Sequence, residues 1–272
     1  MCDQKIELYA STSNNELPVE QESRKNQLIP HLQDADFQEE VLPHISSKIV
    51  GLNAKLVCDG DDRNKADATA RPFRAICKLI ITDNYNNAYM GTGFFISPTC
   101  IATSGHCVFN EGEWVKEVRV IPGSNGRGDA PFGQETSRTF RSVKGWTVDR
   151  RRDFDYGAIL LSDKTLYEKV GAFFRLNTLS SRPTLLNSGY PGDKNGDQWQ
   201  CSGKVKEQTQ FRIYYMIDTE KGNSGSPVIV SDSAGDYVVG IHSYGKCPNF
   251  CIAINNKIME QMDQWAKTVL TT

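Results

Sequence analysis

The stretch KGNSGSP at residues 221–227 places one serine, Ser224, between small residues. Glycine permits tight backbone turns that other residues resist. A sharp turn here would aim the backbone amides of Gly222 and Ser224 at one point, which is the geometry of an oxyanion hole. The same composition is also typical of an ordinary hairpin turn. The stretch therefore predicts a nucleophile only if the chain also supplies a base and an acid.

A serine hydroxyl is a poor nucleophile unless a neighbouring base accepts its proton. The chain has four histidines, and two of them lie in a polar leader, residues 1–55. His106 and His242 remain as candidate bases, and we assign His106 to this role. Asp155 directly precedes an apolar run, which suits a carboxylate held near the interior to orient an imidazole. The sequence thus predicts a triad of His106, Asp155 and Ser224.

Two of these assignments have alternatives. A histidine buried for purely structural reasons is the alternative for His106. Asp153 competes with Asp155 as the acid, but it follows three arginines at residues 150–152 and is expected to be solvated. We prefer Asp155 because it abuts the apolar run.

The main body of the chain has the pattern of an all-β protein. Runs rich in Ile, Val, Phe, Thr and Tyr are separated by clusters of Gly, Asn, Asp and Pro, which predicts a barrel or a sandwich. No helical spacing occurs in the middle of the chain. From residue 256 to 270, apolar residues fall on one face of a helix, which we expect to dock on a barrel. Expected strands include residues 75–82, 93–96, 100–103, 118–121, 157–161, 211–217, 227–230 and 237–242.

Composition limits the classes of function. The 272 residues are 39% hydrophobic, enough for a substantial core in one large or two small domains. A formal net charge of −2 argues against a nucleic-acid partner. Residues 1–55 carry a net charge of −4 and the rest carries +2. We expect residues 1–55 to be a partly disordered pro-segment or a solvated tail, and residues 56–272 to be the folded body.

Targeting and metal signals are sparse. No apolar run approaches the roughly 18 residues of a transmembrane helix, so no membrane association is expected. Asp3, Lys5 and Glu7 interrupt the first ten residues, so no signal peptide is evident there. Eight cysteines show no zinc-ligand spacing, and no metal or cofactor is expected. A small-loop disulfide between Cys247 and Cys251 is plausible.

The motifs together resemble those of the chymotrypsin-like serine proteases, and most of all the bacterial glutamyl endopeptidases, which cut after glutamate. The resemblance runs from about residue 56 to the C-terminus. It implies two six-stranded antiparallel barrels, the triad His106, Asp155 and Ser224, and a disulfide position at Cys107. The motifs are GDDR (60–63), PFRAI (72–76), GFFI (93–96), FDYGAI (154–159), GYPGDK (189–194) and QWQ (198–200).

The resemblance also implies a specificity pocket. Thr219 and His242 match the residues that bind the substrate glutamate in the family, and we include the adjacent Ser243. An imidazole and a hydroxyl are suitable donors for a semi-buried carboxylate. Lys221 departs from the glycine usual in the family. Asp218 stands six residues before Ser224, where trypsin-like enzymes carry the acid that selects Lys or Arg, so that specificity is the alternative.

Activation is expected to differ from that of trypsin. Asn223 replaces the aspartate that binds the new N-terminus in trypsin, and Asn cannot form that ion pair. In the glutamyl family the freed N-terminal amine helps to bind the substrate carboxylate. The register from Arg63 places that terminus at Leu56, after Lys55. We therefore expect a zymogen cleaved between these two residues.

The resulting prediction is a secreted, monomeric serine endopeptidase that acts on proteins or peptides after Glu, and less well after Asp. The reaction would pass through an acyl-enzyme and need no cofactor. Neither a nucleic acid nor a membrane is an expected partner. A non-catalytic protease homologue that binds a partner through the same surface is the second class considered.

Overall fold

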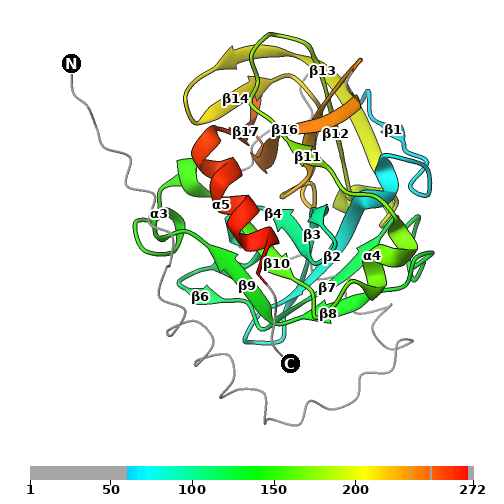
Figure 1. Cartoon of the computed structure of the whole chain (residues 1–272). Coiled ribbons are helices and arrows are strands. Elements are labelled where there is room, and N and C mark those ends of the chain that lie inside the picture. Colours follow the sequence, from blue (N-terminus) through cyan, green and yellow to red (C-terminus); the bar gives the residue numbers. More distant parts are fainter. Residues whose placement is uncertain (1–59, 234, 246, 269–272) are drawn as a thin grey trace.

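The computed structural model describes residues 60–233, 235–245 and 247–268. Their strands form two barrel-like sheets stacked on one another, with a C-terminal helix against them (Figure 1). This arrangement confirms the predicted all-β class with two barrels. The pro-segment prediction for residues 1–55, and Leu56, lie outside the described residues. No helix in the described ranges is both long and apolar enough to cross a membrane.

The first barrel is a sheet of seven antiparallel strands in the order β8-β7-β2-β3-β4-β10-β9. Strands β2, β4 and β10 at its centre are almost wholly buried, which explains their apolar sequences. The strands are β2 (Ile76–Thr82), β3 (Ala88–Ser97), β4 (Cys100–Thr103), β7 (Glu117–Pro122), β8 (Glu135–Ser137), β9 (Thr139–Ser142) and β10 (Gly157–Leu160). Strands β5 (Phe109–Asn110) and β6 (Glu113–Trp114) form a small hairpin between β4 and β7 in the chain.

The second barrel is an eight-stranded sheet in which β14 pairs with both β17 and β13. This double pairing closes six strands into a ring. The strands are β1 (Asn64–Lys65), β11 (Arg175–Leu176), β12 (Thr184–Gly189), β13 (Trp199–Gln208), β14 (Arg212–Tyr215), β15 (Pro227–Asp232), β16 (Gly235–Tyr244) and β17 (Asn249–Ala253). Strand β11 adds to β16 in the parallel sense.

The C-terminal helix α5 (Asn256–Ala266) confirms the amphipathic pattern. The Asn255 side chain caps it by accepting a 3.0 Å hydrogen bond from the Ile258 amide. Ile258, Met262 and Trp265 form its buried face. The Trp265 ring lies 6.0 Å from that of Tyr156, at the start of β10, so the helix supports the strand next to Asp155.

Two short α-helices lie in the middle of the chain, where the sequence shows no helical spacing. They are α3 (Lys144–Thr147) and α4 (Thr165–Val170). A helix of four to six residues is too short to display a hydrophobic period, so no pattern could reveal it. Gly171, with a φ of 62°, ends α4 in the left-handed conformation.

The cysteine predictions are also corrected. Cys251 is a free thiol, so the small-loop disulfide with Cys247 does not form. Cys107 is free as well, and its Sγ packs against Gly91, where an added Cβ would lie 3.1 Å from the sulfur. Both thiols are buried and act as small apolar groups.

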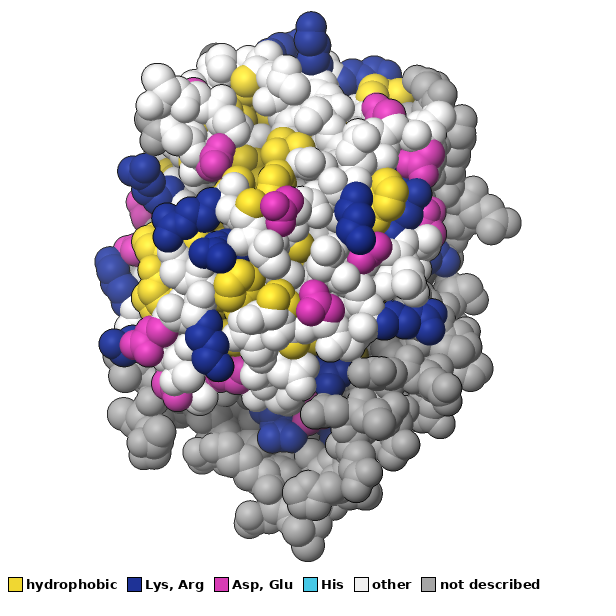
Figure 2. Space-filling model, turned by 90° about the vertical axis from the view of Figure 1, so that its right-hand side faces the viewer, with side chains coloured by type: hydrophobic (Ala, Val, Ile, Leu, Met, Phe, Trp, Pro, Cys, Tyr) yellow, Lys and Arg dark blue, Asp and Glu magenta, His cyan; other side chains and the backbone are white. Residues whose placement is uncertain are grey.

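The surface carries charges of both signs. Figure 2 shows Lys and Arg side chains interspersed with Asp and Glu side chains around smaller apolar patches. This mixture follows from a sequence with 31 basic and 33 acidic residues. The face in view therefore offers no large field of one sign to steer a highly charged partner.

Candidate active site

The turn around Ser224 requires both of its glycines. Gly222 and Gly225 have φ angles of 100° and 86°, which side chains rarely adopt. A Cβ at Gly222 would lie 2.3 Å from the Tyr190 carbonyl oxygen, and one at Gly225 would lie 2.1 Å from that of Thr92. A residue with a side chain would clash with these carbonyl oxygens at either position. The turn therefore requires glycine at both residues.

Hydrogen bonds from both barrels hold the turn. The Thr92 amide of β3 donates to the Ser224 carbonyl at 2.8 Å, and its hydroxyl donates to the Gly222 carbonyl at 2.8 Å. On the other side, the Gly225 amide donates to the His242 carbonyl of β16 at 2.7 Å. Ser224 therefore lies where the two barrels meet.

Two backbone amides of the turn have no acceptor among the described residues. They belong to Gly222 and Ser224. The Lys221 carbonyl accepts a 2.6 Å hydrogen bond from the Gly192 amide, which fixes the preceding peptide. Free amides next to a serine hydroxyl can receive the charge that develops on a carbonyl oxygen under attack.

His106 and Asp155 come from two neighbouring strands of the first barrel. His106 lies in the short 3-10 helix η3 (Gly105–Cys107) that follows β4, and Asp155 follows η4 (Arg152–Phe154) just before β10. Strands β4 and β10 are paired, with Thr103 opposite Gly157. This register brings the two side chains together from positions 49 residues apart.

The two side chains form a buried pair. The His106 Nδ1 lies 2.8 Å from one Asp155 oxygen, and the His106 amide donates to the other oxygen at 2.8 Å. Asp155 is 0% exposed. Asp153, the competing acid, instead forms a 2.8 Å ion pair with Arg212, so the expectation that it is simply solvated is wrong.

This contact controls the charge of the imidazole. Burial by itself lowers the pKa of His106, but the Asp155 carboxylate and its hydrogen bond outweigh burial and raise the pKa above its ordinary value. His106 is thus a stronger base than a free histidine. His106 and Ser224 line the same pocket, together with Cys107, Lys221 and Gly222.

Ser243 lies behind the acid. Its hydroxyl donates to the Asp155 carbonyl at 3.3 Å and lies 3.5 Å from the Ser104 hydroxyl. Ser243 is 4% exposed. Its side chain therefore supports the position of Asp155.

Thr219 and His242 are both buried in the second barrel, at 1% and 3% exposure. The Thr219 Oγ1 has no hydrogen-bond partner among the described residues. His242 pairs through its backbone with Gly225 and Ser226, so it lies next to the nucleophile turn. Its Nδ1 lies 2.7 Å from the Tyr215 hydroxyl, a contact that sequence reasoning did not anticipate. Burial, aided by His106, lowers the pKa of His242 to about 3, so this imidazole is neutral.

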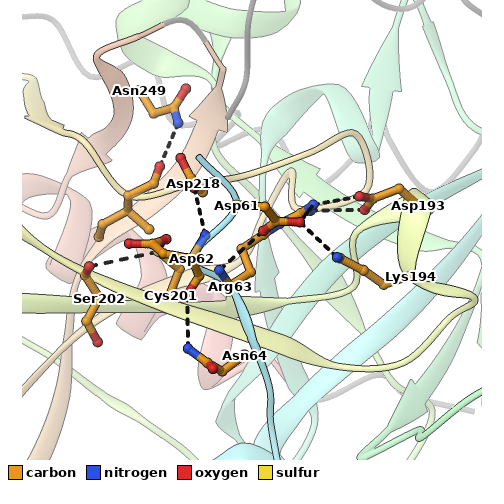
Figure 3. Close-up of polar contacts among 11 residues, drawn as sticks. Asp61, Asp62, Arg63, Asn64, Asp193, Lys194, Cys201, Ser202, Asp218 and Asn249 are labelled. Atoms are coloured by element: carbon orange, nitrogen blue, oxygen red, sulfur yellow. Dashed lines mark hydrogen bonds and ion pairs between the residues drawn. The ribbon is translucent and has the colours of Figure 1, made fainter. Parts of the chain in front are cut away.

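Asp218 faces the segment at the start of the described chain (Figure 3). Its carboxylate accepts a 3.2 Å hydrogen bond from the Asp62 amide, and Asp218 is 3% exposed. The Cys201 thiol donates to the Asp62 carboxylate at 2.8 Å. Residue 62 is therefore anchored beside the position that selects Lys or Arg in trypsin-like enzymes.

Arg63 strengthens this anchor. It is 7% exposed and its guanidinium bonds Asp61 and Asp193, the latter at 2.6 Å and 3.0 Å (Figure 3). Lys194 also reaches Asp61, at 2.9 Å. The hydrogen bond from Arg63 holds the pKa of Asp61 well below its usual range. The motifs GDDR (60–63) and GYPGDK (189–194) thus contribute opposite sides of one ion-pair cluster.

The model of the family described as "Trypsin" matches residues 62–259. The chain belongs to the trypsin family. This trypsin-family chain is 33% identical to a glutamyl endopeptidase of Bacillus licheniformis over 78% of its length and 69% of the relative. It is 31% identical to a Bacillus subtilis protein named "Extracellular metalloprotease", over 82% of this chain and 73% of the relative.

Solved structures agree with the family assignment. A Glu endopeptidase in complex with MPD shares 28% identity, covering 78% of this chain and 100% of its own, with a TM-score of 0.69. The protease Anisep from Arthrobacter nicotinovorans, at 18% identity, has the same fold, with a TM-score of 0.64 over 76% of this chain. The trypsin-family chain is therefore a chymotrypsin-like serine endopeptidase related to glutamyl endopeptidases, and its substrates are proteins or peptides.

Replacement of Asp155 by Asn tests the buried pair. We expect Asp155→Asn to lower kcat by about 10⁴-fold, because the amide no longer holds His106 as the required tautomer. The variant also loses the charge that raises the His106 pKa, so the acidic limb of its residual activity moves to lower pH. The pH dependence of kcat/KM measures both effects.

Asp153→Asn is the matched control, because it removes a carboxylate two residues away that contacts Arg212. We expect kcat of this control within twofold of wild type, since a half-exposed ion pair contributes about 0–1 kcal/mol. Equal losses in both variants would contradict the role assigned to Asp155.

Proposed function

We propose that this enzyme hydrolyses peptide bonds after glutamate, and less well after aspartate, with Ser224, His106 and Asp155 as its triad. His106 accepts the Ser224 proton while the hydroxyl oxygen attacks the carbonyl carbon. The amides of Gly222 and Ser224 stabilise the resulting oxyanion. His106 then gives its proton to the leaving amine, and a water molecule releases the acyl group by the same route.

The proposed specificity rests on the buried Thr219 hydroxyl, which has no hydrogen-bond partner among the described residues. A buried hydroxyl without a hydrogen bond costs free energy, on the order of 1–3 kcal/mol, so proteins rarely keep one without a function. A substrate carboxylate would accept hydrogen bonds from this hydroxyl and from His242, which lies next to the nucleophile turn. Relatives named as glutamyl endopeptidases also support a preference for glutamate.

The alternative specificity for Lys or Arg would require a free carboxylate at Asp218. That carboxylate accepts a hydrogen bond from the Asp62 amide within an anchored segment. We infer that Asp218 holds the segment around Asp62 in place and does not select a basic substrate. The intact set of His106, Asp155 and Ser224 likewise favours an enzyme over a non-catalytic binding module.

We further propose that residues 1–55 form a pro-segment of a secreted zymogen and residues 56–272 the protease domain. The anchored segment at residues 61–63 supports this, because a chain cut before Leu56 would end within about 20 Å of Asp62 at full extension. Its new amine could then assist the substrate carboxylate. One relative is named as extracellular, and Cys247 is disulfide-bonded, which suits an oxidising compartment.

N-terminal sequencing of the active enzyme tests the zymogen proposal. We expect the sequence LVCDG, starting at Leu56. Replacement of Lys55 by Gln should block this cleavage and leave the chain inactive toward peptides. Full activity of a chain that still carries residues 1–55 would contradict the proposal.

Thr219→Val tests the specificity by removing the hydroxyl and keeping the side-chain shape. We expect KM for a peptide with Glu before the scissile bond to rise about 10-fold or more, because a hydrogen bond to a charged group contributes about 1.5–3 kcal/mol. A matched Gln peptide should be affected less. The variant should be no less stable to urea than wild type, because its lost hydroxyl has no partner among the described residues.

Asp218→Asn serves as the comparison variant. The preference for Glu over Gln should persist in it, with no gain or loss of cleavage after Lys or Arg. If wild type cuts after Lys and Arg and this variant does not, Asp218 governs the pocket and the proposed specificity is wrong.

A further inference from the structure

A neutral histidine can bind a carboxylate only through the ring nitrogen that carries its proton. Neutral imidazole has one N–H donor and one bare acceptor nitrogen, and the hydrogen bond made at one nitrogen decides the state of the other. His242 is neutral because it is buried near His106. Its value as a ligand for glutamate therefore depends on which of its nitrogens is protonated.

Tyr215 occupies one of these nitrogens. Its hydroxyl lies 2.7 Å from the His242 Nδ1, and the two ring centroids are 6.1 Å apart. Tyr215 is 0% exposed and lies on β14, whereas His242 lies on β16. Strand β17 separates these two strands in the sheet, so the contact reaches across a whole strand.

The chemistry of the neighbours sets the direction of this hydrogen bond. Burial raises the pKa of Tyr215 well above its ordinary value, so the phenol keeps its proton. The hydroxyl also contacts the thiol of Cys251 on β17, and burial raises the pKa of that thiol to about 12. Because sulfur is a weak acceptor and a bare imidazole nitrogen a strong one, the phenol donates to His242 in preference to Cys251.

We propose that Tyr215 is a positioning residue that holds His242 with its proton on Nε2, ready to donate to the carboxylate of the substrate. This role rests on the glutamate specificity proposed above. The Nδ1 accepts from Tyr215, so the only remaining proton of the neutral ring is on Nε2. Tyr215 on β14 and the neutral His242 on β16 are then successive uncharged donors, and the backbone of His242 bonds to the nucleophile turn. Uncharged groups avoid the cost of burying an unpaired cation.

The first test measures the tautomer of His242 directly in wild type. Nitrogen-15 NMR of the enzyme prepared from the full chain separates a protonated ring nitrogen from a bare one. We expect His242 with a bare Nδ1 and a protonated Nε2 at pH 7. A protonated Nδ1 would overturn the proposal without any need for a variant.

The second test is Tyr215→Phe, which removes only the hydroxyl. We expect KM for the Glu peptide to rise about 10-fold with kcat changed less than twofold, because only a fraction of the rings then present a donor. The matched Gln peptide should change little, and the NMR spectrum should show a mixture of tautomers. A purely structural role would alter both peptides alike.

Tyr214→Phe is the matched control, since Tyr214 lies on the same strand and its hydroxyl contacts Arg212 at 3.3 Å. Its Glu and Gln kinetics should match those of wild type. Equal behaviour of Tyr215→Phe and this control toward the Glu peptide would overturn the proposal. A wild type that does not prefer Glu to Gln would refute the glutamate specificity instead, and the tautomer measurement would still decide what Tyr215 does.

Discussion

The turn at residues 222–225 is the constraint on which the site depends, because both barrels bond to it. Thr92 holds it from the first barrel and the His242 carbonyl holds it from the second. At Gly225 the backbone comes so near to Thr92 that no Cβ fits. Ser224 is thus fixed relative to His106, which belongs to the first barrel, and to Thr219 and His242, which belong to the second. The proposed catalytic and specificity residues therefore meet at one turn.

Two histidines near this turn, the buried His242 and the partly buried His106, differ in pKa because their surroundings differ. The Asp155 carboxylate raises the pKa of His106, so this ring readily accepts a proton. Among the residues that the structure describes, no carboxylate offsets burial at His242, and its pKa falls to about 3. One ring is suited to be a base and the other to be a neutral donor. Similar residues acquire different functions through their neighbours.

Much of this arrangement was predictable from the sequence, and the exceptions have physical reasons. The strand at residues 100–103 and the one starting at Gly157 were found because they are apolar throughout. Strand β13 is not among the expected strands, because it alternates exposed polar residues with few buried ones. The residues of the proposed triad could be singled out because each stands in a distinctive local motif. Tyr215 carries no such signal, since its partner is a residue two strands away.

A map of the sites at which the enzyme cleaves a denatured protein tests the proposed specificity most directly. A denatured protein would be treated with the active enzyme, and the new termini would be mapped by mass spectrometry. We expect termini that follow Glu, with fewer after Asp, because in the proposed specificity the buried Thr219 and the neutral His242 donate to the substrate carboxylate. Termini that follow Lys and Arg would contradict it.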